Sequence, residues 1–153
     1  MKIEFAHKAR QRLDHRLQPL NPVDRFAPPP KGWLRAIREA LGMSGAQLGL
    51  RLGISPQSID AMERSEATGT IKLETLRRAA EALDCTLVYA LVPNQPLETR
   101  MQERARALAV RDLNRIAHTM KLEDQGTDGE NREARIEDYV RNHLRLRDLW
   151  NGK

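Results

Sequence analysis

Between residues 44 and 64 the chain carries polar side chains that both donate and accept hydrogen bonds. Gln57 and Ser58 directly follow a serine and a proline. Their amide and hydroxyl groups suit the edges of base pairs in a major groove, and Arg64 suits a phosphate or a guanine. The predicted DNA-binding residues are Ser44, Gln47, Ser55, Gln57, Ser58, Ala61 and Arg64. The alternative is an ordinary helical hairpin whose polar residues face solvent.

The same stretch predicts two short helices joined by a tight turn. Ser44 can cap the first helix, and Gly53 tolerates the positive φ of a turn that ends it. Ser55 can cap the second helix, with Pro56 at its first position, where a missing N–H costs nothing. Gly49 lies where the two helices would cross. The residues spaced to share one core are Leu48, Leu52, Ile54, Ile59 and Met62. This arrangement would present the second helix to a major groove.

No set of residues with catalytic or metal-binding spacing is evident. The sequence has no glycine-rich phosphate loop and no paired carboxylate site. The four histidines, which have no ligand-like spacing with Cys85 or with one another, are His7, His15, His118 and His143. Cys85 is better explained as a small core residue than as a nucleophile. We therefore expect a protein that is not an enzyme and that needs neither a metal nor a cofactor.

Composition is typical of a helix-rich protein of the cytoplasm. The 153 residues are 31% charged and 40% hydrophobic, with one cysteine, which excludes an internal disulfide and fits a reducing compartment. No run approaches 18 apolar residues, and the first residues lack the apolar core of a signal peptide. These features predict a cytoplasmic protein that does not enter a membrane.

Pattern and charge divide the chain into three parts. Residues 1–31 form a basic helical arm and a proline-rich linker, with seven Lys or Arg against three Asp or Glu. The positive charge suits contacts with phosphates, or it simply keeps the arm solvated. Residues 32–92, with seven of each charge, form the helix-turn-helix domain. Residues 93–153 form a helical region suited to binding a partner. The predicted flanking helices are 3–18, 97–122 and 132–149, with a break at 125–129.

Residues 85–92 are short, apolar and partly β-branched, which predicts a strand that ends the domain. An isolated strand leaves its backbone donors and acceptors unpaired. Pairing with its copy across a twofold axis, centred near Val88, would solve this and give a homodimer. Alternatively, a strand within 65–73 pairs with it inside one chain, and the helix 97–122 holds the dimer. The predicted fold is mostly α, with a helix-turn-helix core, one short strand and helical extensions at both ends.

Residues 33–84 resemble the Cro and phage-repressor class of helix-turn-helix proteins, the XRE family, which implies a lambda-repressor-like core. The resemblance lies in Leu34-Arg-Ala-Ile-Arg38, Gln47-Leu-Gly49, Leu52-Gly-Ile-Ser55, Met62-Glu-Arg64 and Leu76-Arg-Arg-Ala-Ala-Glu-Ala-Leu83. It implies an ion pair between Arg38 and Glu63. In that family a glutamine that contacts phosphate stands where this chain has Gly45, and the loop 65–72 is longer than usual, so DNA affinity could rely on other residues, such as the basic arm.

To about residue 125 the chain also resembles a narrower family, mobile mystery protein A. The shared text includes Phe26-Ala-Pro-Pro-Pro-Lys-Gly-Trp33, Leu87-Val-Tyr-Ala-Leu-Val-Pro93 and Leu122-Glu-Asp-Gln125. This resemblance implies a bacterial, nucleoid-associated regulator paired with a Fic-domain toxin that transfers AMP.

Inhibitors of Fic proteins carry Ser or Thr and, four residues later, Glu followed by Gly or Asn. Thr119 and Glu123 fit as partner-inhibitory residues, although aspartate follows. The pairs Thr70 with Glu74 and Thr99 with Glu103 fit the pattern equally well.

Together these observations predict a DNA-binding transcriptional repressor that acts as antitoxin and autoregulator of a toxin–antitoxin module. Its partners would be double-stranded operator DNA, a Fic-domain toxin and a second copy of the chain. The alternative is a protein-interaction module that inhibits a Fic partner directly, with little or no role for DNA.

Overall fold

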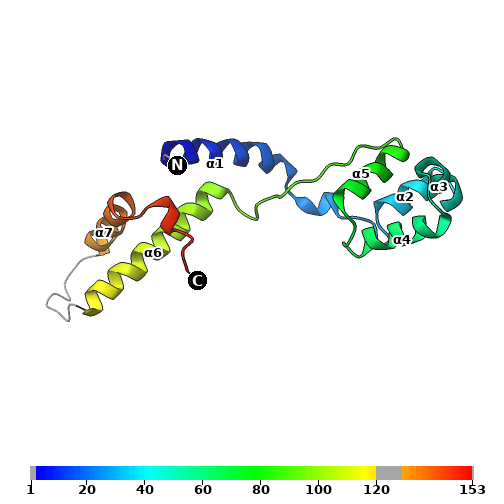
Figure 1. Ribbon diagram of the computed structural model, residues 1–153. Helices are drawn as coiled ribbons and strands as arrows, with labels where there is room; N and C mark the ends of the chain where they lie inside the picture. The colour runs from blue at the N-terminus through cyan, green and yellow to red at the C-terminus, as the bar shows by residue number, and fades with distance from the viewer. Residues whose placement is uncertain (1–2, 120–128, 153) are drawn as a thin grey trace. The chain divides into compact units, whose positions relative to one another are not determined.

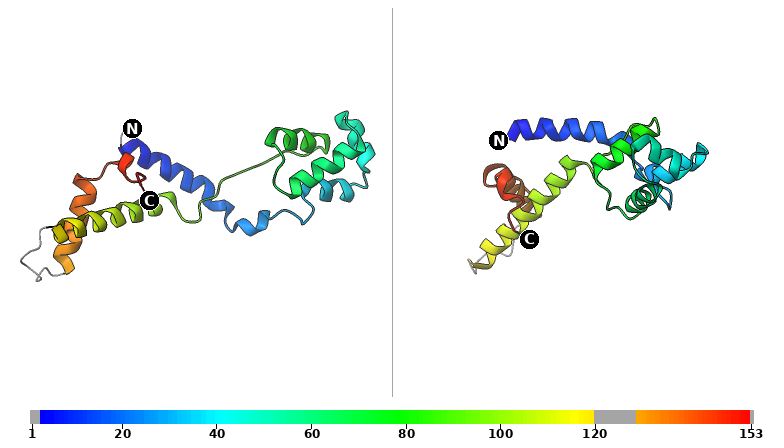
Figure 2. Two further views of the ribbon diagram at one scale, coloured as in Figure 1. Left: turned by 60° about the horizontal axis from the view of Figure 1, so that its bottom comes forward. Right: turned by 45° about the vertical axis from the view of Figure 1, so that its right-hand side comes forward.

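The computed structural model describes residues 3–119 and 129–152. Every regular element among these residues is helical, and the chain forms two compact units, Met1–Asn21 with Val92–Lys153 and Pro22–Leu91. Figures 1 and 2 show that the central part of the sequence forms one unit, whereas the two ends of the chain meet in the other. None of the helices in the described residues is both long and apolar enough to cross a membrane.

The central unit contains four short helices around one small core. They are α2 (Trp33–Ala40), α3 (Gly45–Leu52), α4 (Pro56–Ala67) and α5 (Leu73–Ala82). The buried core residues are Leu34, Leu48, Ile59, Ala79 and Leu83. Leu52, Ile54 and Met62 pack against them, so the residues spaced for a shared core do meet. Each large side chain buried here stabilises the fold by about 1.5–3 kcal/mol before entropy is counted.

The predicted strand 85–92 is wrong, because no strand is present in the described part of the chain. Cys85 packs against the core, but Val88 and Leu91 are 83% and 87% exposed. An apolar run becomes a strand only where a neighbouring strand supplies hydrogen bonds and a surface to pack on. Residues 65–73, the proposed pairing partner within the chain, are the end of α4, a loop and the start of α5.

The other unit is built on a long helix. α1 (Ile3–Leu17) packs against the start of α6 (Leu97–Thr119), and α7 (Gly129–Asn142) packs on α6 as well. Asp14 of α1 caps α6 from outside, since its carboxylate accepts from the N–H groups of Leu97 (2.7 Å) and Glu98 (3.2 Å). Glu98 in turn accepts from Arg10 at 2.6 Å. Partial burial opposes ionisation of Glu98, but the hydrogen bonds and positive charges of Arg10 and His7 together outweigh it, and the pKa of Glu98 lies below its ordinary value.

The last helix is shorter than its apolar spacing predicts. The sequence favours a helix over 132–149, whereas α7 ends at Asn142 and a 3-10 turn follows at Leu146–Asp148. Leu149 is only 2% exposed because it packs against Ala105 and Leu108 of α6. The chain must leave the helical path to bring it there. The predicted break at 125–129 lies mostly outside the described residues.

The linker between the units is not uniformly extended. Two 3-10 turns, Gln18–Leu20 and Val23–Phe26, interrupt the proline-rich stretch 19–32. Proline fixes φ near the value such turns use, so a proline-rich segment accommodates them.

The contact of Asp14 with α6 predicts that Asp14→Ala destabilises the unit that holds the chain ends. The substitution leaves two N–H groups at the start of α6 without their acceptor, at a cost of about 0.5–2 kcal/mol. Urea denaturation followed by circular dichroism measures this cost. Asp24→Ala, at an exposed turn, is the matched control, and an equal loss in both variants would contradict the capping role.

Candidate nucleic-acid interface

Helices α3 and α4 are separated by a three-residue turn, as a helix-turn-helix requires. Gly53 ends α3 in the left-handed region, with φ of 69°. The N–H of Ile54 donates to the carbonyl of Gly49 at 2.9 Å. Ser55 then caps α4, which starts at Pro56. The turn is therefore fixed by a glycine, a cap and a proline, each at a position that its chemistry favours.

Gly49 allows the turn to approach α3 closely. A Cβ added at Gly49 would lie 2.5 Å from the carbonyl oxygen of Ile54, which belongs to the backbone and has no room to move. The sequence placed this glycine where the two helices cross, and the structure shows that its neighbour is the backbone of the turn itself. Even alanine at this position would push the turn away from α3.

The outer face of α4 is polar, and its inner face is buried. Ile59 and Glu63 are buried, whereas Gln57, Ala61 and Arg64 are exposed on the other side. The guanidinium of Arg64 donates to Asp60 at 2.7 Å in an exposed ion pair. Exposed pairs of this kind contribute about 0–1 kcal/mol, so Arg64 can exchange Asp60 for another anion at low cost.

Three of the predicted DNA-binding residues cap helices through their side chains. The Ser44 hydroxyl accepts from the N–H of Gln47 (3.1 Å), and the Gln47 side-chain oxygen accepts from the N–H of Ser44 (2.7 Å). The Ser55 hydroxyl accepts from the N–H of Ser58 (3.1 Å), and the two hydroxyls lie 2.9 Å apart. These side chains fix the first turns of α3 and α4. Gln57, Ala61 and Arg64 are left as the outward-facing group on α4.

A buried ion pair fixes α4 against α2. Arg38 donates to the Glu63 carboxylate through Nε (2.5 Å) and through a terminal nitrogen (3.0 Å), and it also donates to the carbonyl of Met43 (2.9 Å). The hydrogen bond from Arg38 to Glu63 raises the pKa of Arg38 above its ordinary value. Because the Glu63 side chain is only 5% exposed, Arg38 rather than water is its hydrogen-bonding partner.

A second carboxylate on α4, which sequence reasoning missed, holds the other end of α2. Glu66 accepts from the N–H groups of Trp33 (2.8 Å) and Leu34 (2.9 Å). A Cβ at Gly32, whose φ is 85°, would lie 2.7 Å from the Glu66 carboxylate. One feature of the sequence could have indicated this contact. Gly32 precedes α2 and has no side chain that could cap the helix, so a residue elsewhere in the chain had to supply the cap.

Thr119 and the four histidines belong to the other compact unit, Met1–Asn21 with Val92–Lys153. Thr119 lies in the last turn of α6, where its hydroxyl donates to the carbonyl of Arg115, and Glu123 lies outside the described residues. His143 stacks on Tyr139, and His7 lies 3.2 Å from Glu98. No group of three His, Cys, Asp or Glu side chains that could hold a metal occurs within residues 3–119 and 129–152.

The burial of Glu63 predicts a large loss of stability when its side chain is removed. Glu63→Ala leaves the Arg38 charge half-buried without its partner and should cost about 3–5 kcal/mol. Glu66→Gln keeps one acceptor for the end of α2 and should cost about 1 kcal/mol. Urea denaturation compares both with Glu74→Ala, an exposed control on α5. A Glu63→Ala protein as stable as the control would contradict the role of the pair.

Comparison with known proteins agrees with this geometry. Residues 34–89 match the family model HTH_3, described as helix-turn-helix. The match covers α2 to α5 and reaches into the exposed segment that follows them. No curated protein and no solved structure matches the chain. Residues 34–89 are thus a helix-turn-helix domain of the XRE type, a kind of domain that binds DNA in transcriptional regulators and is typically not catalytic.

Proposed function

We propose that this protein is a transcriptional repressor that reads an operator with α4. The observation that carries the proposal is the orientation of α4: its inner face is tied to α2 by two carboxylates, and its outer face presents Gln57, Ala61 and Arg64. A helix held rigidly with one polar face outward fits the major groove of B-DNA.

Each outward side chain has a chemistry that base pairs can use. Gln57, in the first turn, can donate to and accept from an adenine edge, and the methyl group of Ala61 can contact a thymine methyl group. Arg64 can leave Asp60 for a phosphate or a guanine. The near-neutral charge of residues 32–92 means that base contacts, more than charge, have to provide the affinity of this domain.

The operator would be read by a homodimer. A single module of this kind contacts too few base pairs for strong specificity, so two copies bind two half-sites. Residues 86–91 supply a surface for this contact, because Val88, Tyr89 and Leu91 are mostly exposed although they are large and apolar. Burial of these side chains against the same segment of a second copy would remove them from water.

The biological role we propose is that of antitoxin and autoregulator beside a Fic-domain toxin. The support is the resemblance to mobile mystery protein A, which includes the stretch 26–33 before the domain and the stretch 87–93 at its end. The second compact unit then offers the surface for the toxin. In a more specific version of this proposal, Thr119 and Glu123 inhibit that toxin directly.

The function is tested by the effect of Gln57→Ala on binding to the promoter DNA of the protein's own gene. Loss of a base contact should weaken promoter binding by about 1–3 kcal/mol and leave binding to random DNA nearly unchanged. Fluorescence anisotropy at several salt concentrations measures both affinities. Gln102→Ala, an exposed glutamine of α6, is the matched control. Equal weakening on both DNAs would show that Gln57 does not determine specificity.

The dimer is tested by Val88→Pro. Since Val88 is exposed in the single chain, the substitution should leave the helical circular dichroism signal unchanged but should produce monomers with weaker promoter binding. Analytical ultracentrifugation gives the state of association. The control is Leu50→Ser, which changes another exposed apolar residue without placing a proline inside α3. A Val88→Pro protein that is folded and still dimeric would contradict the proposed surface.

A further inference from the structure

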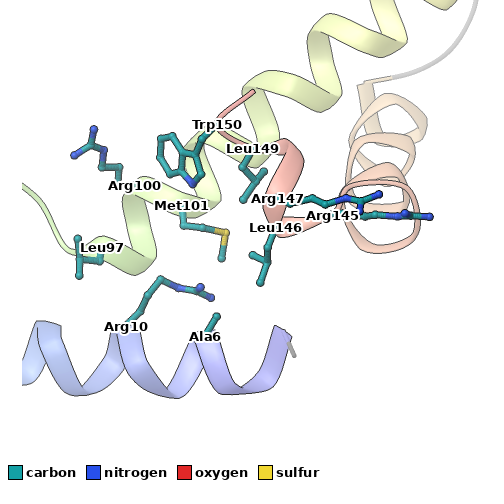
Figure 3. A pocket seen from close by; sticks show the side chains of 10 residues that line it. All are labelled: Ala6, Arg10, Leu97, Arg100, Met101, Arg145, Leu146, Arg147, Leu149 and Trp150. Carbon is teal, nitrogen blue, oxygen red and sulfur yellow. The ribbon is translucent and has the colours of Figure 1, made fainter. Parts of the chain in front are cut away.

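The unit formed by the chain ends contains a cavity of about 960 Å³, within the range of small-molecule sites. It lies between α1, the start of α6 and the C-terminal turn, as Figure 3 shows. Its lining includes Arg10, Leu97, Arg100, Met101, Arg145 and Trp150. Every polar residue of this lining is an arginine, and none is acidic.

The walls of the cavity are fixed by specific contacts. Arg104 donates to the carbonyl of Leu149 (2.8 Å) and to that of Gly152 (3.2 Å), which holds the C-terminal segment against α6. The ring of Trp150 lies 5.7 Å from the guanidinium of Arg100 and 6.0 Å from that of Arg104. These cation–π contacts keep the ring at the cavity although it is 56% exposed. An apolar wall is thereby held open to solvent.

The charge around the cavity is positive at its rim. Arg10 points inward and is matched by Glu98 at 2.6 Å. Arg100, Arg145 and Arg147 are exposed, and Figure 3 shows that their side chains extend outward. Arg147 has Asp148 at 3.7 Å. The cavity therefore combines an apolar interior with cations at its edge.

We propose that this cavity binds a small amphipathic carboxylate, with its apolar chain on Leu97, Met101 and Trp150 and its carboxylate at the arginine-rich rim. Arginine pairs with carboxylates through two parallel hydrogen bonds, and an apolar wall favours an alkyl chain over a charged body. The proposal does not depend on DNA binding, because all the residues that carry it belong to one unit.

The test is isothermal titration calorimetry of the full chain with dodecanoate, kept below its micelle-forming concentration. Dodecanoate should bind measurably, whereas acetate and dodecyltrimethylammonium should not. The double variant Arg100→Gln with Arg145→Gln should weaken binding by roughly tenfold to a hundredfold. Trp150→Ala should also weaken dodecanoate binding, because it removes the aromatic ring from the apolar wall of the cavity. Arg141→Gln, an exposed arginine of α7 outside the lining, should leave it unchanged.

Several outcomes would overturn the proposal. Dodecyltrimethylammonium could bind as tightly as dodecanoate, the double variant could bind dodecanoate as well as the unchanged protein, or Arg141→Gln could weaken binding as much as the double variant. Each of these results would indicate non-specific adsorption. Sedimentation velocity tests a second copy as occupant: self-association that the double variant abolishes would assign the cavity to a protein contact instead. Because the arginines concerned are exposed, their substitution should not unfold the unit, and circular dichroism checks this.

Discussion

The geometry of α4 depends on two of its carboxylates, which lie three residues apart. Glu63 binds Arg38 near the end of α2, and Glu66 accepts the first N–H groups of α2. Residues three apart lie on the same face of a helix, so both carboxylates point inward while the other face stays free. The direction of α4 relative to α2 is therefore set at two points, which a single contact could not achieve.

The remaining features of the domain add to this constraint. The caps at Ser44 and Ser55 fix where α3 and α4 begin, and Gly49 lets the turn approach α3. Leu48 and Ile59, fully buried, fill the space between the helices. Under the proposed function, a rigid α4 loses little conformational freedom on binding DNA, so more of its contact energy is available for affinity and specificity.

Much of the domain could be predicted from sequence because its signals are local. A serine before a helix, a glycine in a turn and a proline at the first helical position each act within a few residues. What sequence could not provide were contacts between distant residues. The cap of α2 by Glu66 spans 32 residues, and the cap of α6 by Asp14 spans 83. The strand prediction failed for a related reason, since a strand depends on a partner that the apolar run 85–92 does not itself contain.

The central claim is that the outer face of α4 contacts base pairs, and NMR titration of the protein with its promoter DNA tests it most directly. The account predicts the largest shift changes at Gln57, Ala61 and Arg64, together with contacts from the Ala61 methyl group to base protons. The signals of the buried Glu63 and the half-buried Glu66 should stay unchanged, because the α2–α4 packing does not change. Shift changes that occur only outside Pro22–Leu91, with α4 unaffected at saturating DNA, would contradict the account.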